Sequence, residues 1–394
     1  MDVELRQATM SDREKIGTFL EVSFPNRYRY PERWEWLNMR NPFITDGFGI
    51  PEWIALIDGR VVGHLGLMLV PVKIREHTSI ESWAVDFIIS EGLRGSGVGT
   101  KLVIAMSQEV DLLVFTLELT DVSRTVAKKI DGLEGGLTAY LLYRTNFIIS
   151  SSVNQEIGSI FKERFRLNDH FISRAVNILG LSKAYCRIIK HKIQARQGNN
   201  LKALKEDSTL TLEPINRFDE QADTLWDAIR ARYTFTVERT STYLNWRYFE
   251  QPHMSHQCFY LFEKRIVKGI LVVRRGKLPE EHDVGVICEC YVNEPDHVML
   301  SWLVKKAVAR LTKQGVAGIW AATADREVEE IFRKLGFLQI RRTSMTMNYM
   351  DSCYDADNIF TRPLIGKGDH DWDQFPTLRQ PSLGQFIKLA KQND

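Results

Sequence analysis

The sequence predicts an α/β protein with two tandem mixed-sheet α/β domains joined by a basic helical segment. A Trp-x5-Pro element occurs twice, at Trp36 and again at Trp246. After each element come an apolar strand, a short polar turn and a second apolar run that carries a glycine, Gly63 or Gly269. Strands then alternate with helices in both halves, which is typical of a mixed α/β sheet. Two copies of one unit are the simplest account of this order.

The predicted domains follow this repeat and a change in charge along the chain. Residues 1–150 carry 16 Lys and Arg against 20 Asp and Glu, whereas residues 151–205 carry 11 against three. Charge this asymmetric between neighbouring segments indicates a boundary. We expect an N-terminal domain, a basic helical linker, a C-terminal domain and an irregular tail, at 1–150, 151–208, 209–350 and 351–394.

The pattern of each copy predicts its helices and strands. The first copy opens with a strand at 3–7 and a helix that Ser11 caps, with Glu14 at the capping-box position. A second helix is expected near Pro31, because proline is favoured in the first turn. The remaining expected elements are strands at 82–89, 112–117, 286–292 and 318–322, and helices at 97–108, 299–312 and 325–335.

Composition narrows the class of protein. No run of 18 apolar residues is present, and the start of the chain is acidic where a signal peptide would be basic. The five cysteines are scattered, which suits reduced thiols better than a disulfide framework. We therefore expect a cytoplasmic protein.

A glycine-rich loop follows the strand at 82–89 and precedes the helix at 97–108. Its sequence is Arg94-Gly95-Ser96-Gly97-Val98-Gly99. Glycines let backbone N–H groups turn inward and let a phosphate approach closely. The helix N-terminus adds a partial positive charge at the same place. Strand, loop and helix together predict an anion site, although a plain structural turn also fits three glycines in five residues.

The spacing excludes two common phosphate loops, because a Walker loop needs Gly-Lys-Ser/Thr and a dinucleotide loop needs G-x-G-x-x-G. The remaining R-x-x-G-x-G pattern resembles the pyrophosphate loop of the GNAT superfamily of acyl-CoA-dependent N-acyltransferases. Three further segments match that family in order: 6–12, 57–63 and 333–337. The resemblance covers about 1–150 and 209–349. The tandem order is more narrowly similar to two-lobed GNAT proteins found with bacterial polysaccharide biosynthesis.

The resemblance implies a function and a set of site residues. It implies acyl transfer, with acetyl-CoA as co-substrate, to an amine of a small molecule or glycan such as an amino sugar. By this resemblance the backbone of Phe87, Ile88 and Ile89 pairs with the pantetheine arm. The pyrophosphate is expected on Arg94, Gly95, Ser96, Gly97, Val98, Gly99 and Thr100.

The catalytic residues are less firmly indicated. Asp86 matches an acidic position on the family's strand and either draws a proton from the amine or is a hydrogen-bonded structural carboxylate. Tyr143 is the candidate general acid and Tyr140 the reserve, but Asn146 stands where the family has glycine. The corresponding loop of the second copy has no glycine and carries two carboxylates, so we expect that copy to be catalytically silent.

Residues with an expected acceptor role are Trp36, Arg40, His64, Trp246 and Arg247. For Trp246 and His64, packing in the core is the competing interpretation. No metal site is expected: Cys288 and Cys290 lie two apart on a strand, which would point both to one face, and there is no second pair. The segment Gly366–Asp373 could bind a cation, or be a solvated loop.

The basic middle of the chain leaves several partners open. Residues 170–195 alternate apolar and basic residues like an amphipathic helix. A helical bridge between the domains, an anionic membrane surface and an anionic acceptor all fit, and nucleic acid fits less well. Two other functions also remain: a non-catalytic module that binds CoA or another anion, and a Fem-like aminoacyl or peptidyl transferase that uses tRNA. The sequence does not indicate the oligomeric state.

Overall fold

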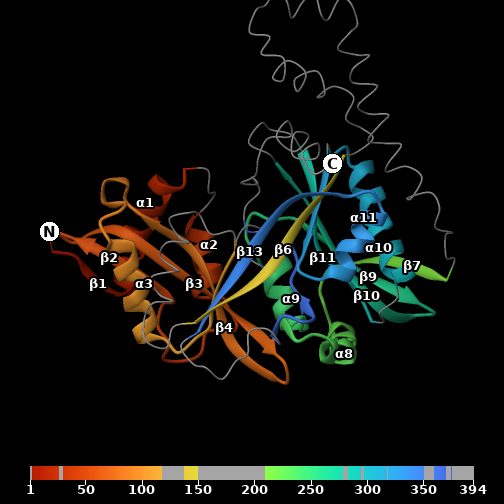
Figure 1. Cartoon of the computed structure of the whole chain (residues 1–394), viewed down its shortest axis with the longest axis horizontal. Helices are drawn as coiled ribbons and strands as arrows, with labels where there is room; N and C mark the ends of the chain where they lie inside the picture. The colour runs from red at the N-terminus through yellow and green to blue at the C-terminus, as the bar shows by residue number, and fades with distance from the viewer. Residues whose placement is uncertain are drawn as a thin grey trace, which may run out of the picture.

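The computed structural model describes residues 2–25, 30–117, 137–149, 209–277, 283–293, 297–316, 318–349, 359–369 and 374. The strands at 137–149 and 338–349 are described by their backbone. Figure 1 shows two lobes side by side, with the N-terminal lobe in red and orange and the C-terminal lobe in green and blue. The predicted basic linker at 151–208 lies outside the described residues.

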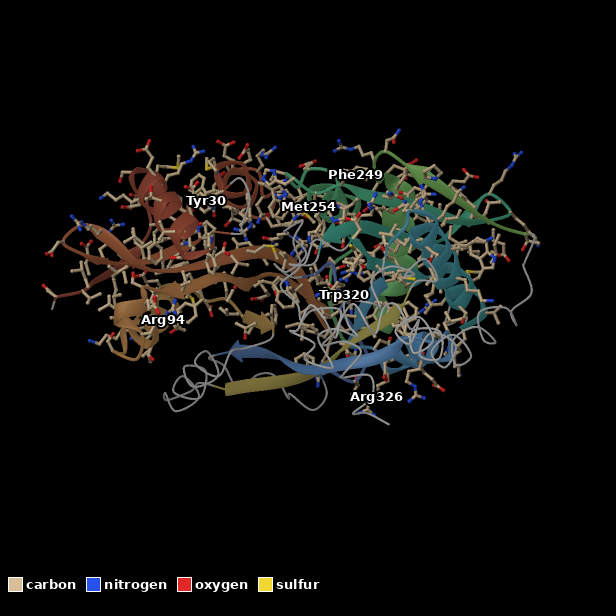
Figure 2. All side chains as sticks on the ribbon, turned by 90° about the horizontal axis from the view of Figure 1, so that it is seen from above. Tyr30, Arg94, Phe249, Met254, Trp320 and Arg326 are labelled. Atoms are coloured by element: carbon tan, nitrogen blue, oxygen red, sulfur yellow. The ribbon has the colours of Figure 1, made fainter. Side chains whose placement is uncertain are left out.

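The N-terminal lobe contains the elements expected of the first copy. They are β1 (Glu4–Gln7), the 3-10 helix η1 (Met10–Asp12), α1 (Arg13–Ser23), α2 (Tyr30–Asn38), β2 (Glu52–Ile57), β3 (Arg60–Ile74), β4 (His77–Ile89), the 3-10 helix η2 (Glu91–Leu93), α3 (Val98–Glu109) and β5 (Val114–Leu117). Helices α1 and α2 cover one face of the sheet and α3 covers the other (Figure 2). The mixed α/β fold class is confirmed.

The C-terminal lobe repeats this order. Its elements are β7 (Leu210–Ile215), α8 (Glu220–Ile229), the 3-10 helix η3 (Arg230–Arg232), β8 (Phe235–Val237), α9 (Ser241–Tyr248), β9 (His256–Glu263), β10 (Ile266–Lys277), β11 (Asp283–Val292), α10 (His297–Lys313), β12 (Gly318–Thr323) and α11 (Arg326–Lys334). Both hairpins turn through residues with positive φ: Asp58 and Gly59 in the first lobe, Lys264 and Arg265 in the second. Such turns match the twist of the flanking strands.

The two lobes exchange their closing strands. β6 (Leu137–Ile149) follows the N-terminal lobe in sequence but pairs with β12 of the C-terminal lobe. β13 (Leu338–Tyr349) follows α11 but pairs with β5 of the N-terminal lobe. β6 and β13 also pair with each other, so the described strands form one sheet in the order β1-β2-β3-β4-β5-β13-β6-β12-β11-β10-β9-β7. Figure 1 shows these two strands crossing between the lobes.

A second contact between strands joins the lobes through β8, which pairs with β3 of the N-terminal lobe and with a strand of the tail. β8 of the C-terminal lobe pairs antiparallel with the end of β3, where Val72 lies opposite Val237. The tail, expected to be irregular, supplies β14 (Pro363–Leu364), which pairs parallel with β8. Leu364 and Ile365 are buried in the core that both lobes share. The expectation of an irregular tail thus misses a segment that this core needs.

Two tryptophans meet at the centre of this shared core. Trp36 on α2 and Trp246 on α9 stack with ring centroids 4.6 Å apart and an angle of 15° between the planes. The indole N–H of Trp36 donates to the carbonyl of Trp246 at 2.9 Å, and the reverse bond measures 3.2 Å. The repeated Trp-x5-Pro element therefore marks a reciprocal contact between the lobes.

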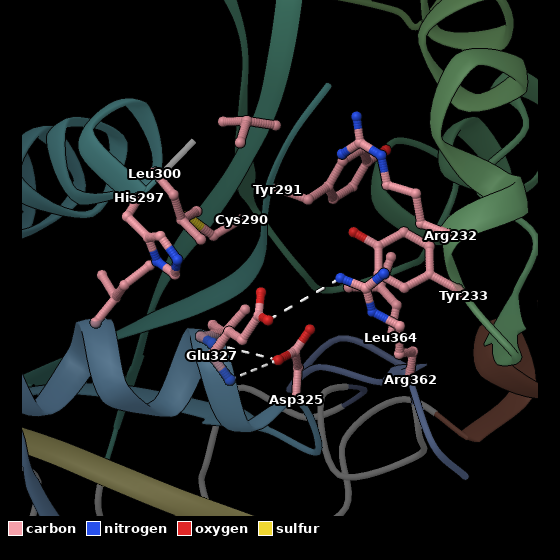
Figure 3. Close-up of a pocket in the computed structure, with 13 residues that line it drawn as sticks. Arg232, Tyr233, Cys290, Tyr291, His297, Leu300, Asp325, Glu327, Arg362 and Leu364 are labelled. Atoms are coloured by element: carbon pink, nitrogen blue, oxygen red, sulfur yellow. Dashed lines mark hydrogen bonds and ion pairs between the residues drawn. The ribbon is translucent and has the colours of Figure 1, made fainter. Parts of the chain in front are cut away.

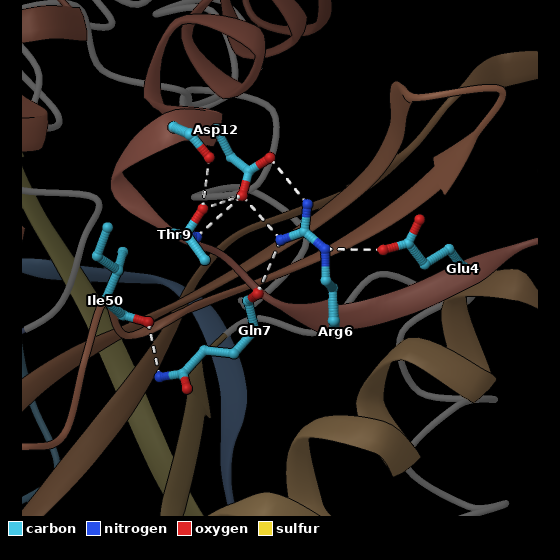
Figure 4. A network of polar contacts seen from close by, with 7 residues as sticks. Glu4, Arg6, Gln7, Thr9, Asp12 and Ile50 are labelled. Atoms are coloured by element: carbon cyan, nitrogen blue, oxygen red, sulfur yellow. Dashed lines mark hydrogen bonds and ion pairs between the residues drawn. The ribbon is translucent and has the colours of Figure 1, made fainter.

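A polar network fastens β1 to the start of the first helical segment (Figure 4). The Arg6 guanidinium donates to both Asp12 carboxylate oxygens, at 2.7 and 2.9 Å. Asp12 Oδ2 also accepts from the Thr9 N–H and hydroxyl. The predicted cap of Ser11 with Glu14 is therefore wrong: the pair is Thr9 with Asp12, because a 3-10 turn at Met10–Asp12 precedes α1.

None of the helices in the part of the chain described above combines the length and the apolar character needed to span a bilayer.

Replacing Trp36 by alanine tests the contact between the lobes. The change leaves a large cavity and removes the hydrogen bond that the Trp36 indole donates to the carbonyl of Trp246, so we expect the free energy of unfolding to fall by about 3–5 kcal/mol. Met39, on the residues that follow α2, has a side chain 57% exposed. Met39→Ala is therefore the control and should change stability by less than about 0.5 kcal/mol in chemical denaturation. Equal effects of the two variants would contradict the role given to Trp36.

The Arg6–Asp12 pair predicts a pH dependence of stability. Hydrogen bonds from Arg6, opposed by burial and supported by Thr9, hold the pKa of Asp12 well below its ordinary value. A lowered pKa stabilises the fold above the ordinary aspartate pKa, and this stability is lost as the pH falls through the folded-state pKa. Wild type should exceed Asp12→Asn by about 1.5–3 kcal/mol at pH 6, and the gap should close on acidification. The exposed Glu14 gives the control: Glu14→Gln should lack this acid-dependent gap.

Candidate functional site

A bulge interrupts β4 at Asp86. Gly63 pairs with Ile89 and His64 with Ile88, but Gly66 pairs with Val85, so two residues of β4 lie opposite one of β3. Asp86 has a φ of 54°, which is rare for a residue with a side chain. Bulges redirect side chains and end regular pairing. The strand is thus bent immediately before Phe87, the first residue expected to bind pantetheine.

β4 and β5 stop pairing before this bulge. Their parallel pairing is confined to Ser82 with Val114 and Trp83 with Phe115, whereas β4 continues to Ile89. No other described strand pairs with the edge of residues 84–89 that faces β5. Phe87, Ile88 and Ile89 are half-buried. This leaves a strand edge and apolar side chains where an extended ligand can add to the sheet.

The glycine loop lies at the end of this strand and opens into α3. Gly95 and Gly97 have φ values of 85° and 91°, in the left-handed region that glycine tolerates. A Cβ at either position would meet no atom within 4 Å, so both face open space. Gly97 caps α3 without a side-chain hydrogen bond, which leaves the first N–H groups of the helix for a ligand.

Other residues of the loop hold it against the strand. Gly99 packs closely, since an added Cβ would lie 3.2 Å from both Phe87 Cζ and Ile89 Cγ1. The Ser96 hydroxyl donates to the carbonyl of Leu93 at 2.7 Å, which shapes the turn from within. The Arg94 Nε donates to the carbonyl of Ile89 at 3.2 Å. Figure 2 shows Arg94 on the side of the sheet that carries α3, opposite Tyr30.

The charge distribution at this mouth favours an anion. Arg94 is exposed, and Val98 and Thr100 begin α3 beside it. A helix N-terminus attracts negative charge, and its open N–H groups hydrogen-bond phosphate oxygens. The structure therefore brings together the seven residues expected at the pyrophosphate, 94–100, next to the three expected at pantetheine.

Asp86 belongs to a buried network on the other face of the sheet. Its Oδ2 accepts from Arg33 Nη1 at 2.5 Å, and both side chains are almost fully buried. Arg33 is held in turn by Gln374, whose Oε1 accepts at 2.9 and 2.6 Å. The Gln374 amide also contacts Met68 Sδ at 2.9 Å. A residue from the tail thus fixes the arginine that holds Asp86.

His64 links Asp86 to a second buried carboxylate. Its Nδ1 lies 3.0 Å from the carbonyl oxygen of Asp86, and its Nε2 lies 3.6 Å from Glu52 Oε1. Glu52 also accepts from Trp34 Nε1 at 3.0 Å and Asn38 Nδ2 at 3.1 Å. Burial opposes ionisation of Glu52, but the nearby imidazole of His64 and hydrogen bonds from Trp34 and Asn38 outweigh it and lower its pKa. His64 is therefore held through Nδ1 beside the bulge, with its Nε2 near Glu52 but without a hydrogen-bond partner in the described structure.

The other expected acceptor residues are divided between core and surface. Trp36, Trp246 and Arg247 are at most 1% exposed and lie in the core between the lobes. Arg247 Nε donates to the carbonyl of Gly368 at 2.7 Å. Arg40 is exposed on the residues after α2. The structure therefore does not bring these four residues together at one accessible surface.

The tyrosine candidates lie on the exchanged strand β6. Tyr143 pairs with Thr343 and Tyr140 with Thr346 along β13. Their side chains lie outside the described residues, so their role as general acid stays a prediction.

The C-terminal lobe has its own buried carboxylate at the position of Asp86. Glu289 lies three residues before Val292, which pairs with Gly269 as Ile89 pairs with Gly63. Burial raises the pKa of Glu289 to about 7, with Arg239 opposing the rise and Asp369 adding to it. Tyr248 donates to Glu289 at 2.8 Å, and Arg239 bonds Asp369 at 2.6 Å. This lobe thus keeps the carboxylate, whereas its loop has no glycine.

Sequence reasoning missed most partners in these networks. Arg33, Glu52, Gln374, Arg239 and Glu289 are functional or structural partners that no motif marked. A usable signal existed for Glu289, which stands in an apolar strand three residues before Val292, the residue that pairs with Gly269. Asp86 likewise stands three residues before the residue that pairs with Gly63. Arg33 lies one helical turn before Trp36, on the face of α2 that is buried.

The cysteine pair does not share a face as the sequence suggested. A bulge places two residues of β11 opposite one of β10 at Cys288. Cys288 therefore packs in the core shared by the lobes, and Cys290 packs with the helices on the other face. Asp369, part of the tail segment considered for a cation, is fully buried and bonded to Arg239. Within the described residues no cluster of three or more metal-ligating side chains occurs.

Part of the chain matches a known family. Residues 14–116 match the family model described as the Acetyltransferase (GNAT) family. The match runs from α1 to β5 and so includes the bulge, the glycine loop and the start of α3. No curated protein matches the chain in sequence.

The fold is similar to that of solved acyltransferases. A GCN5-related N-acetyltransferase from Anabaena variabilis aligns with a TM-score of 0.57 and 10% identity, covering 89% of this chain and 74% of that chain. A probable N-acyltransferase from Enterococcus faecalis aligns at 0.54 and 10%, covering 89% and 73%. Saccharomyces cerevisiae N-myristoyltransferase with bound myristoyl-CoA aligns at 0.54 and 8%, covering 88% and 82%. At these identities the likeness shows the fold.

Replacing Arg33 by methionine tests the network behind the bulge. The change leaves the Asp86 carboxylate buried without its cation, which typically costs about 3–5 kcal/mol of stability. Chemical denaturation should show this loss, and the double variant Arg33→Met, Asp86→Asn should recover part of it. Arg40→Met, on an exposed arginine seven residues away, should be close to wild type. A single variant as stable as wild type would show that the ion pair does not support the bulge.

Proposed function

We propose that this chain is an acyl-CoA-dependent N-acyltransferase whose active site lies in the N-terminal lobe. One observation carries the proposal: an open glycine loop at the mouth of α3 adjoins a strand edge that β5 has left uncovered. The loop suits the pyrophosphate of CoA and the edge suits its pantetheine arm. The GNAT family match over residues 14–116 supports the same region as the site.

In the proposed reaction the acceptor amine attacks the thioester carbonyl, the C–S bond breaks, and a proton passes from the amine to the leaving thiolate. The residues of this chain would position the two substrates and move the proton. Asp86, positioned by its hydrogen bond from Arg33, is proposed to receive the proton of the amine directly or through water. Tyr143, with Tyr140 as the alternative, is proposed to return a proton to sulfur.

The proposed acceptor is an amine, and an amino sugar of a surface polysaccharide or its precursor is our specific suggestion. It rests on the sequence resemblance to two-lobed GNAT proteins. Acetyl is the proposed acyl group, and the fold's likeness to an N-myristoyltransferase makes longer chains worth testing. Comparing acetyl-CoA with myristoyl-CoA as donors, against an acceptor panel read by mass spectrometry, would identify both substrates.

Binding of CoA by purified protein tests the site directly. Ligand at about 100 times its dissociation constant should stabilise wild type by about 2.7 kcal/mol in a thermal shift. Gly97→Asp places a carboxylate at the open loop and strains a residue with a φ of 91°. We expect its affinity for CoA to fall about 100-fold, since opposed like charges cost several kcal/mol.

Gly59→Asp is the matched control, because Gly59 also has positive φ and open surroundings but lies in the β2–β3 turn. It should bind CoA like wild type. Binding of CoA without transfer to any amine would support a non-catalytic binding module instead. Failure to bind CoA, together with retention on tRNA, would replace the proposal with a Fem-like transferase.

A further inference from the structure

The C-terminal lobe contains a cavity at the position that corresponds to the proposed acyl-CoA site. β11 and β12 pair from Val284 to Val286 and then diverge, as β4 and β5 do. The cavity is lined by Cys290, Tyr291 and Val292, which stand where Phe87, Ile88 and Ile89 stand in the other lobe. The lobe has thus lost the glycine loop but kept the opening between its strands.

One wall of this cavity has polar groups that lack partners. Tyr291 is 2% exposed, and its hydroxyl makes no hydrogen bond within the described structure. Arg232 is half-buried, and none of the ion pairs or hydrogen bonds of the described residues includes its guanidinium. Figure 3 shows Arg232, Tyr233 and Tyr291 close together on one side of the cavity. An unpaired buried hydroxyl is costly, so this wall is suited to an added hydrogen-bond acceptor.

The carboxylates on the opposite wall already have partners. Asp325 caps α11, where its Oδ1 accepts from the N–H groups of Glu327 at 2.7 Å and Val328 at 3.4 Å. Glu327 lies 4.0 Å from the Arg362 guanidinium in an ion pair. Dashed lines in Figure 3 mark these contacts. The two acids balance the charges of Arg232 and Arg362, so these four groups carry no net charge. Among them, the Arg232 guanidinium is the group without an ion pair or hydrogen bond in the described residues.

Apart from His297, the rest of the lining is apolar, and the space is small. Leu300, Val328, Ile331 and Leu364 supply hydrocarbon walls. The enclosed volume of about 60 Å³ compares with about 150 Å³ for a cavity that holds benzene. It therefore fits a few heavy atoms, with the remainder of a longer ligand extending through the open side.

We propose that this cavity binds a short-chain carboxylate, with the Arg232 guanidinium and the Tyr291 hydroxyl on the carboxylate and the apolar wall on the hydrocarbon. A planar guanidinium pairs with a carboxylate through two parallel hydrogen bonds. The site is separate from the glycine loop of the N-terminal lobe. It does not depend on the proposed transferase activity, and it gives the lobe that we expect to be catalytically silent a ligand of its own.

Butyrate is the probe, with butyramide as its neutral counterpart and inorganic phosphate as an anion without hydrocarbon. Saturation-transfer NMR and calorimetry on the full-length protein should show saturable binding of butyrate, about tenfold or more tighter than butyramide. Arg232→Gln should weaken butyrate binding by a similar factor, whereas Arg217→Gln, at an exposed arginine of the same lobe, should not. Equal binding of acid and amide, preference for phosphate, or no saturable binding would each overturn the proposal.

Two further variants sharpen the test. Tyr291→Phe shows whether the Tyr291 hydroxyl binds the ligand or only supports the fold, and Gly97→Asp shows whether butyrate binds at this cavity or at the glycine loop. Tyr291→Phe removes a hydroxyl that has no partner, so it should weaken butyrate binding while leaving the protein as stable as wild type or more stable. A merely structural tyrosine would show the opposite loss of stability. Gly97→Asp should leave butyrate binding unchanged, because it alters the other anion site. Loss of butyrate binding in Gly97→Asp would place the carboxylate at the glycine loop and contradict the proposal.

Discussion

The reciprocal contact of Trp36 with Trp246 is the constraint on which the arrangement of the lobes depends. Each indole stacks on the other and donates to the other's backbone carbonyl, so neither helix can rotate or shift without breaking two kinds of interaction. Arg247 lies over the Trp36 ring at 5.7 Å, on the same helix as Trp246. Because α2 also carries Arg33, this central contact sets the place of the guanidinium that holds Asp86.

The two lobes show how one unit diverges around a common geometry. In both lobes a bulged strand, β4 or β11, separates from its parallel neighbour. A buried carboxylate, Asp86 or Glu289, stands three residues before the residue of that strand that pairs with a glycine of the preceding strand. The N-terminal lobe adds an open glycine loop, whereas the C-terminal lobe fills the space above its carboxylate with the tail. Gly368 there lies so close to Tyr248 that an added Cβ would clash with its hydroxyl. The same scaffold thus has an exposed glycine loop in one lobe and a buried polar network around Glu289 in the other.

The sequence was sufficient for elements whose signal is local. Hairpins, the glycine loop and the helices α3, α10 and α11 follow from apolar periodicity and turn residues, and their bounds agree within a few positions. It was insufficient for the exchanged strands. The sequence of a strand does not specify whether it pairs within its own lobe or with the other lobe, and here tertiary packing selects the other lobe. The helix cap at Thr9 was misassigned because the chain makes a 3-10 turn first. Arg33 and Gln374 were missed since their partner, Asp86, is distant in sequence from both.

The exchange of closing strands has a consequence for biosynthesis. The backbone partner of β5 lies more than 200 residues further along the chain, since Leu117 pairs with Met345. During translation this edge of β5 therefore stays without its strand partner until residues 345–348 have left the ribosome. Exposed strand edges invite association with other chains, and long-range pairing is slow. The first lobe is therefore complete only once β13, which follows the last helix of the second lobe, has been made.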